Sequence, residues 1–452
     1  MSAPDRESSD RPASDRPTSD RRILDRRILG LAVPALGALV AEPLFLLTDS
    51  ALVGHLGAVP LAGLALGGAV LQTIVGLMVF LAYSTTPRVG RALGEGDERR
   101  AVAAGVDGGW LALALGAVIA VAGAILAPAL IGLFGAEADV ADAGVRYLSV
   151  SMAGIPAMLG VFALTGLLRG FQDTRTPLVI AAGGFALNAA LNAVLIYPVG
   201  LGITGSALGT VVAQWAMFAA YAAVAVRLAR RVGAPLRPHL AGLRSSAGSG
   251  GWMLLRTASL RAAILLAITV ATSFGAEELA AFQVAMTLFS TVAFALDAVA
   301  IAAQALLGRL LGAGALAEAR AVTKRCVTWG IAAGVVLGLV VIASSGLLPH
   351  VFSSDREVLR LLPATLAVVG VTAPLGGYVF VLDGVLIGAG DGRYLALSGL
   401  ANLAIFTPLA LLAPLAPADW RLLALWTAFG LGFLGARALT LGLRVRSDVW
   451  LR

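Results

Sequence analysis

Residues 28–57 read ILGLAVPALGALVAEPLFLLTDSALVGHLG, a stretch that is long and apolar enough to cross a lipid bilayer. It also carries two carboxylates, Glu42 and Asp49, and two prolines, Pro34 and Pro43. A charged group at membrane depth costs at least ~2.5 kcal/mol, so its presence indicates a functional site. Proline frees a backbone carbonyl and allows a spanning helix to bend. We therefore expect a bendable helix with a titratable acid, Asp49, in its outer half. The alternative is that Asp49 lies hydrated and inert at the helix end.

The composition of the whole chain excludes a soluble protein. Of its 452 residues, 59% are apolar and 13% are charged, whereas a soluble domain carries about 25% charged residues. We therefore expect an all-α polytopic membrane protein. Residues 1–22 are polar and lack the apolar core of a signal peptide, which indicates a disordered cytoplasmic tail. The single cysteine, Cys326, excludes an internal disulfide.

Twelve apolar runs have the length of a membrane span, and the basic residues between them set the orientation. With the N-terminus in the cytoplasm, 27 of the 33 lysine and arginine residues fall on the cytoplasmic side. Cytoplasmic loops are enriched in these residues, so we expect both termini inside and a multi-pass protein of the bacterial inner membrane. The expected spans are residues 28–53, 60–85, 102–134, 144–168, 177–198, 204–229, 251–275, 278–306, 326–349, 360–388, 394–414 and 420–442.

The two halves of the chain repeat one another at a fixed offset of 218 residues. One matching pair could arise by chance, but three separated pairs at the same offset indicate a duplication. The pairs are residues 57–58 with 275–276, 90–96 with 308–314, and 166–175 with 384–393.

Each half contributes six spans, so both halves cross the membrane in the same direction. Parallel repeats of this kind form two bundles related by a pseudo-two-fold axis, which is a transporter architecture with the binding site between the bundles. We predict a polar tail at 1–22, an N-lobe at 23–230, a cytoplasmic linker at 231–250 and a C-lobe at 251–445.

Several motifs together resemble one known family. Pro34 precedes Asp49 in the first span, a Gly-Arg-x-x-Gly motif follows the second and eighth spans, and residues 168–175 read LRGFQDTR. This pattern is similar to the multidrug and toxic compound extrusion (MATE) family, and within it to the DinF-like branch. Residues 296–308, LDAVAIAAQALLG, resemble actinobacterial members of that branch. The resemblance covers residues 22–445.

The resemblance implies an antiporter in the lipid bilayer that exports organic, often cationic, small molecules in exchange for protons or sodium ions. We expect it to act as a monomer and without a cofactor. It implies that Asp49 is the cation-coupling residue and that Asn188, Asn192 and Thr210 are its partners. Some relatives have a second acid where this chain has an asparagine, and a tyrosine where it has Phe45. These departures argue against a sodium site with two carboxylates, so we expect proton coupling, with sodium as the alternative ion.

The residues themselves give a physical reason for this site. Asn188 and Asn192 are one helical turn apart and share a face, and by residue count they lie at a depth similar to that of Asp49. An amide can hydrogen-bond the charged or the neutral form of a carboxyl group. We expect protonation of Asp49 to bend the first span at its prolines, contract the N-lobe cavity and expel the substrate. The alternative is that the asparagines only hold neighbouring helices together.

Four charged residues lie within the spans of the second half. By their depth from the cytoplasmic ends, we predict two internal ion pairs, Arg261 with Asp297 and Arg256 with Asp383. We expect a structural role for these pairs; a second coupling site is the alternative.

Aromatic residues and methionines at membrane depth supply candidates for the wall of a cavity that accepts varied apolar cations. Core packing is the alternative for each of them, and Glu42 is a second candidate acid that could face the same aqueous space. The candidates are Glu42, Phe45, Met78, Tyr83, Met158, Phe162, Met286, Phe289 and Tyr378.

Three other classes of membrane protein were considered. A lipid or lipid-linked oligosaccharide flippase on a related scaffold favours a strongly cationic central cavity, and basic residues within the spans are few here. An integral-membrane transferase needs clustered catalytic groups or a large loop, and a channel does not account for duplicated lobes around one buried acid. No metal-ligand spacing, nucleophile–base pair or phosphate-binding loop occurs in the sequence, so we expect no enzyme activity and no metal site.

Overall fold

The computed structural model describes residues 16–353 and 355–451, and all regular elements in this part of the chain are helical. Twelve segments of it are long and apolar enough to cross a membrane. The predicted all-α, twelve-span architecture is therefore confirmed.

The first half forms the N-lobe, in which two of the six spans are interrupted. The second span breaks at Val79, and a 3-10 turn at Met152–Gly154 interrupts the fourth. The helices are α1 (Arg16–Gly54), α2 (Ala58–Met78), α3 (Phe80–Gly94), α4 (Glu98–Gly132), α5 (Ala138–Ser151), α6 (Ile155–Gly170), α7 (Arg175–Ile196) and α8 (Gly202–Val232).

The second half forms the C-lobe with a corresponding set of spans. Its last span contains a π-helical turn, Ala428–Phe433, between two α-helical pieces. The helices are α9 (Leu240–Thr272), α10 (Ala276–Gly312), α11 (Leu316–Ser344), α12 (Pro349–Phe352), α13 (Arg356–Gly388), α14 (Gly392–Leu412), α15 (Arg421–Thr427) and α16 (Leu434–Arg446).

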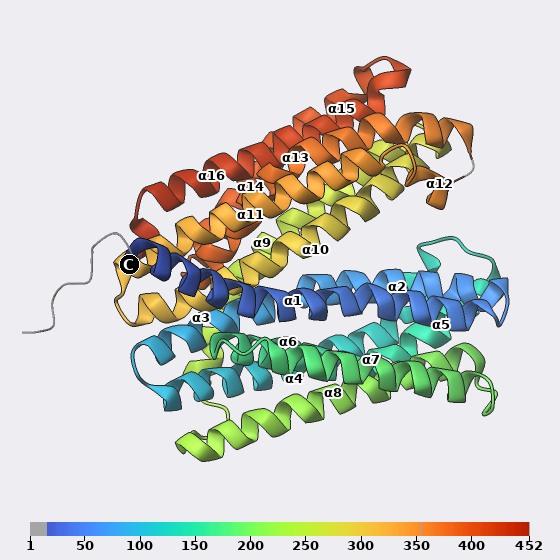
Figure 1. The fold of residues 1–452 in the computed structure, drawn as a ribbon. Helices are drawn as coiled ribbons and strands as arrows, with labels where there is room; N and C mark the ends of the chain where they lie inside the picture. The colour runs from blue at the N-terminus through green and yellow to red at the C-terminus, as the bar shows by residue number, and fades with distance from the viewer. Residues whose placement is uncertain (1–15, 354, 452) are drawn as a thin grey trace, which may run out of the picture.

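The two lobes meet at one end of the molecule and diverge toward the other. In Figure 1 the start of α1, the end of α16 and the loops after α3 and α10 lie together at the meeting end. We call this the closed end and the opposite one the far end. Helix α10 of the C-lobe contacts α1 and α3 of the N-lobe, so these three helices form the centre of the interface.

The repeated glycine motifs explain how the lobes approach so closely at the closed end. A Cβ atom on Gly94 would collide with the backbone carbonyl of Arg309, and one on Gly312 would collide with that of Arg91. The helices α3 and α10 therefore cross with backbone against backbone, each presenting the same motif to its repeat. These glycines therefore have a packing role at the interface between the lobes.

A second reciprocal contact joins the lobes. Helix α1 starts on the C-lobe, where the Asp25 carboxylate accepts hydrogen bonds from Arg325 Nε (2.5 Å) and Nη2 (2.6 Å) and from Trp329 Nε1 (2.8 Å). Helix α9 starts on the N-lobe, where the buried Asp107 carboxylate accepts a hydrogen bond from the backbone N–H of His239 at 3.0 Å.

The observed bounds of α1 and α9 correct two predicted boundaries. Residues 16–22 of the predicted tail belong to helix α1, while residues 1–15 lie outside the described part of the structure. The predicted linker at 231–250 is helical from Leu240 onward, which leaves residues 233–239 as the connection. Residues 245–251 are rich in serine and glycine but remain helical. Glycines let this part of α9 pack closely: Gly242 lies against Asp107, and Gly250 lies against Phe80.

Candidate functional site

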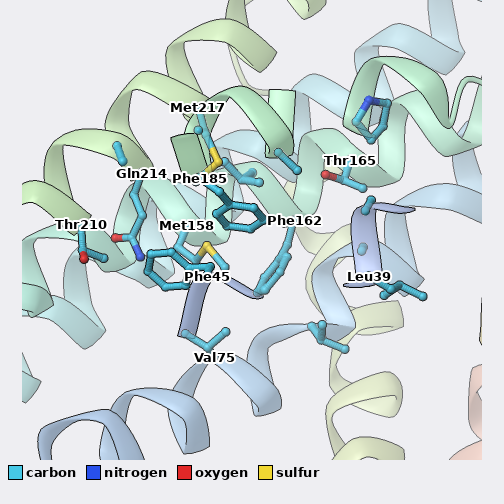
Figure 2. Close-up of a pocket in the computed structure, with 18 of the residues that line it drawn as sticks. Leu39, Phe45, Val75, Met158, Phe162, Thr165, Phe185, Thr210, Gln214 and Met217 are labelled. Carbon is cyan, nitrogen blue, oxygen red and sulfur yellow. The ribbon is translucent and has the colours of Figure 1, made fainter. Parts of the chain in front are cut away.

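The N-lobe contains a cavity of about 260 Å³, lined mainly by α1, α2, α3, α6, α7 and α8. Aromatic and methionine side chains form its middle, with Phe45, Phe162, Phe185, Met158 and Met217 facing one another (Figure 2). Phe45 stacks on Phe185 with 5.3 Å between ring centroids, which ties α1 to α7 across the cavity. Such a wall accepts apolar and aromatic bodies of varied shape.

The structure places only part of the predicted cavity wall at this cavity. Phe45, Tyr83, Met158 and Phe162 line it, whereas the side chain of Glu42 lies outside the described part of the structure.

The other four candidates pack elsewhere among the described residues. Val75 and Val79, one turn apart, occupy the face of the second span that borders the cavity, so Met78 points away into the core. The remaining three belong to the C-lobe, and Phe289 illustrates their role, since its ring packs edge-on against Phe429 at 5.3 Å. For these residues the core-packing alternative holds: Met78, Met286, Phe289 and Tyr378.

The predicted coupling residues lie together at one end of the cavity. The Asp49 carboxylate is 4% exposed, and its Oδ1 accepts a hydrogen bond from Asn192 Nδ2 at 2.8 Å. The same Nδ2 donates to Asn188 Oδ1 at 3.2 Å, and Asn188 Nδ2 donates to Thr210 Oγ1 at 3.0 Å. Asn188 and Thr210 also line the cavity. A continuous chain of hydrogen bonds therefore connects the buried acid to the space where a ligand fits.

Ser206 is a further member of this network and was not among the predicted residues. Ser206 Oγ donates a second hydrogen bond to Asp49 Oδ1 at 2.7 Å and is fully buried. Ser206 precedes Thr210 by one helical turn, so the spacing that places the two asparagines on one face of α7 also places these two hydroxyls on one face of α8. Both donors reach Oδ1, which leaves Oδ2 of Asp49 without a hydrogen bond from the described residues.

Close packing holds the amide of Asn192 in place. A Cβ atom on Gly209 would collide with Asn192 Oδ1, and this oxygen is buried without a hydrogen-bond donor among the described residues. An unpaired buried acceptor costs about 1–3 kcal/mol. Asn192 Oδ1 can therefore accept a hydrogen bond from a hydroxyl group that lies within reach of it.

The MatE family model matches residues 34–194 and 253–412, one match in each lobe, and together they span more than half of the chain. The chain belongs to the MATE family. Members of this family are efflux transporters and not enzymes.

Individual MATE relatives cover most of the chain. It is 30% identical over 392 residues to the chloroplastic protein DETOXIFICATION 44 of Arabidopsis thaliana, a match that covers 81% of this chain and 73% of the relative. It is 28% identical over 370 residues to DNA damage-inducible protein F of Escherichia coli, with 79% of each chain covered. The fold matches that of a mutant of the Vibrio cholerae MATE transporter VcmN with a TM-score of 0.87 and 22% identity, covering 96% of this chain and 99% of that one.

The C-lobe of this MATE transporter contains a buried charge cluster. Arg256 Nη2 lies against Asp383 Oδ2, as predicted, and Arg437 Nη2 lies 3.4 Å from the other carboxylate oxygen. Arg437 was missed because by residue count it falls near the cytoplasmic end of its span, and no sequence signal marked it as buried. Arg256 also stacks over the ring of Tyr83 at 5.5 Å, so the cluster reaches the N-lobe.

The second predicted pair, Arg261 with Asp297, is wrong. Arg261 is five residues after Arg256 on α9, so it points to a different side of the helix, and its guanidinium lies against Gly76 of α2. Asp297 instead borders the N-lobe cavity. Depth was predicted from residue counts, but the direction in which each side chain points depends on helix rotation.

Proposed function

We propose that this MATE transporter exports cationic or amphipathic organic compounds in exchange for protons, and that Asp49 is the residue that carries the proton. The observation that supports this most directly is the hydrogen-bond chain from Asp49 through Asn192 and Asn188 to Thr210, because its last two members border the cavity. A change in the charge of Asp49 can thereby change the surface that a substrate meets.

The chemistry of the network favours a proton over a sodium ion. The groups that reach Asp49 Oδ1 are an amide N–H and a hydroxyl, which are donors. A sodium ion needs several oxygen ligands, and here one carboxylate would be the single anionic ligand in the network. A proton needs only the free Oδ2 and an acceptor for the resulting O–H. Asn192 can provide that acceptor if its amide rotates, because its carbonyl oxygen has no donor in the described part of the chain.

Proton uptake would change the position of α1. Ser206 and Asn192 hold a charged carboxylate more strongly than a neutral one, so protonation loosens the attachment of α1 to α7 and α8. Pro34 and Pro43 leave the helix able to bend between this attachment and the closed end. A shift of α1 would move Phe45, which stacks on Phe185, and so reshape the cavity. Proton binding and substrate binding would thereby oppose each other, because both depend on the position of α1.

We propose that the closed end faces the cytoplasm of a bacterial cell and that the far end faces outward. The excess of arginine near the closed end supports this orientation. The state described here would then receive protons from outside and release substrate there, with the protein acting as a monomer.

Transport into inside-out vesicles tests the proposal. A fluorescent cationic dye would be offered with either a proton gradient or a sodium gradient, for the wild type, for Asp49→Asn and for a control, Asp139→Asn, an exposed acid. We expect the proton gradient alone to drive accumulation in the wild type and the control, and Asp49→Asn to lose it. Accumulation driven only by sodium would contradict the choice of ion, and full transport by Asp49→Asn would exclude Asp49 from the mechanism.

A further inference from the structure

The cavity has a second polar end that the proposed coupling mechanism does not use. Thr210 and Gln214 lie at one end and Thr165 lies toward the other, with the aromatic residues between them (Figure 2). Arg169 follows Thr165 by one helical turn on α6, so it lies further toward that second end, and it lines the cavity. Asp297 lines the cavity as well, and it is the one C-lobe residue among the described residues that do so.

Arg169 and Asp297 are oppositely charged but do not pair. Both residues line the cavity together with Tyr83, the two side chains act on each other electrostatically, and both act on Tyr83. Arg256 acts on Asp297 as well. Among the described residues, however, no ion pair or hydrogen bond joins Arg169 to Asp297 or satisfies either of them elsewhere; the buried ion pairs of the C-lobe involve Arg256 and Arg437 with Asp383. Both are only partly buried, on the surface of the cavity.

This arrangement is costly unless a ligand completes it. Charged groups at membrane depth normally pair with each other or with a substrate, because lipid and protein solvate them poorly. Here two opposite charges face the same space from different lobes and remain apart. The guanidinium presents a planar pair of donors that matches a carboxylate, and the carboxylate is a partner for an ammonium group.

We infer that Arg169 and Asp297 form a binding site for the polar end of a zwitterionic amphiphile. Its ammonium group binds Asp297, its carboxylate binds Arg169, and its aromatic body lies between Phe45, Phe162 and Phe185. This inference rests on the proposed export function and specifies its substrate class. Because Asp297 belongs to α10 and Arg169 to α6, a bound zwitterion also bridges the two lobes near their interface.

Binding of three matched probes tests the site. The probes share one fluorescent aromatic core that carries an ammonium and a carboxylate, the methyl ester of that compound, or its N-acetyl derivative, so they are a zwitterion, a cation and an anion. Affinities are measured on the purified full chain in nanodiscs without any gradient. We expect the wild type to bind the zwitterion at least about tenfold more tightly than either of the others, a difference of ~1.4 kcal/mol.

Two variants test which residue binds the ammonium group of the probe and which binds its carboxylate. Asp297→Asn should weaken the zwitterion and the cation about tenfold and leave the anion unchanged. Arg169→Gln should weaken the zwitterion and the anion and leave the cation unchanged. Asp139→Asn and Arg356→Gln are matched controls, since both residues are exposed outside the cavity, and they should bind all three probes as the wild type does.

Several results would overturn the inference. Equal affinity of the wild type for the three probes would exclude a two-charge site, whether or not the variants fold. A loss of anion binding in Asp297→Asn equal to its loss of cation binding would show a general disturbance of the cavity; Asp297→Glu, which keeps the charge, should retain the wild-type order of affinities. Gradient-driven dye transport without charge preference would refute this site alone, whereas charge preference without transport would refute the proposed function alone.

Discussion

Asp107 and Arg325 occupy the same position in the two halves of the chain, 218 residues apart, and each binds the start of a helix from the opposite lobe. Asp107 on α4 holds the beginning of α9 through the backbone N–H of His239, and Arg325 on α11 holds the beginning of α1 through Asp25. The residue types differ, but each anchors a helix of the other lobe. Two equivalent contacts, one on each side of the pseudo-two-fold axis, therefore hold the lobes together at the closed end.

The Asp25–Arg325 contact should govern how readily the closed end opens. Both side chains are at most about a third exposed, and the two hydrogen bonds are charge-assisted. We expect Asp25→Asn to raise the population open at this end about tenfold, or ~1.4 kcal/mol. Spin labels at the exposed far-end residues Glu137 and Leu347, in a background with Cys326 replaced by alanine, would report a shorter distance. An unchanged distance distribution would show that the glycine crossing alone keeps this end closed.

The glycine crossing should not tolerate a side chain. Gly312→Ala puts a methyl group against the carbonyl of Arg91 at a point where both partners are backbone, so we expect the lobes to separate locally. We predict a loss of thermal stability of at least ~2 kcal/mol, together with reduced transport. The control is Gly183→Ala on α7, where an added Cβ meets nothing within 4 Å and should be neutral or slightly stabilising. Equal melting temperatures of the two variants would argue against close packing at Gly312.

Removal of Ser206 should change the pH dependence of transport without abolishing it. The Ser206 hydroxyl donates to Asp49 Oδ1 at 2.7 Å, which favours the charged carboxylate. In Ser206→Ala the neutral form is relatively favoured, so protons bind at lower concentration and the midpoint of the pH profile moves upward. A hydrogen bond to a charged group is worth ~1.5–3 kcal/mol, so we expect a shift of about one pH unit or more. Ser249→Ala, which loses only two hydrogen bonds to carbonyls of its own helix, should keep the wild-type midpoint.

The C-lobe cluster should contribute to stability rather than to transport. Asp383 is the one carboxylate that directly contacts both Arg256 and Arg437 among the described residues. Asp383→Asn would remove the charge of the carboxylate that contacts two buried guanidinium groups, at a cost of ~3–5 kcal/mol. We expect a markedly lower melting temperature but near-normal transport per folded molecule. Transport lost at an unchanged melting temperature would instead assign Asp383 a role in coupling.

Much of the fold could be predicted because hydrophobic runs and arginine positions directly reflect the bilayer. The Asp49–Asn192 contact followed from depth and helical spacing, together with the resemblance to a known family, and Ser206 could have been found from its spacing to Thr210. The position of Asp297 could not be predicted in this way. Whether it faces Arg261 or the cavity depends on the rotation of α10 and α9, which packing at the lobe interface decides.

The start of α9 also could not be predicted from local sequence patterns. A Ser/Gly-rich run such as residues 245–251 usually connects domains, but here it continues α9, and Ser246 and Gly250 pack against α3. Tertiary contact therefore outweighed the low helix propensity of glycine.

The exchange of helix starts between the lobes has a consequence for the origin of the duplicated chain. A six-helix ancestor with the same contacts would have exposed a docking surface on its third span and a protruding first helix. In a dimer of two copies, the first helix of each would have bound the third span of the other. Fusion through a short connection such as 233–239 would then have turned a dimer into one polypeptide. After fusion the two equivalent positions could diverge, so that one half has Asp107 and the other has Arg325.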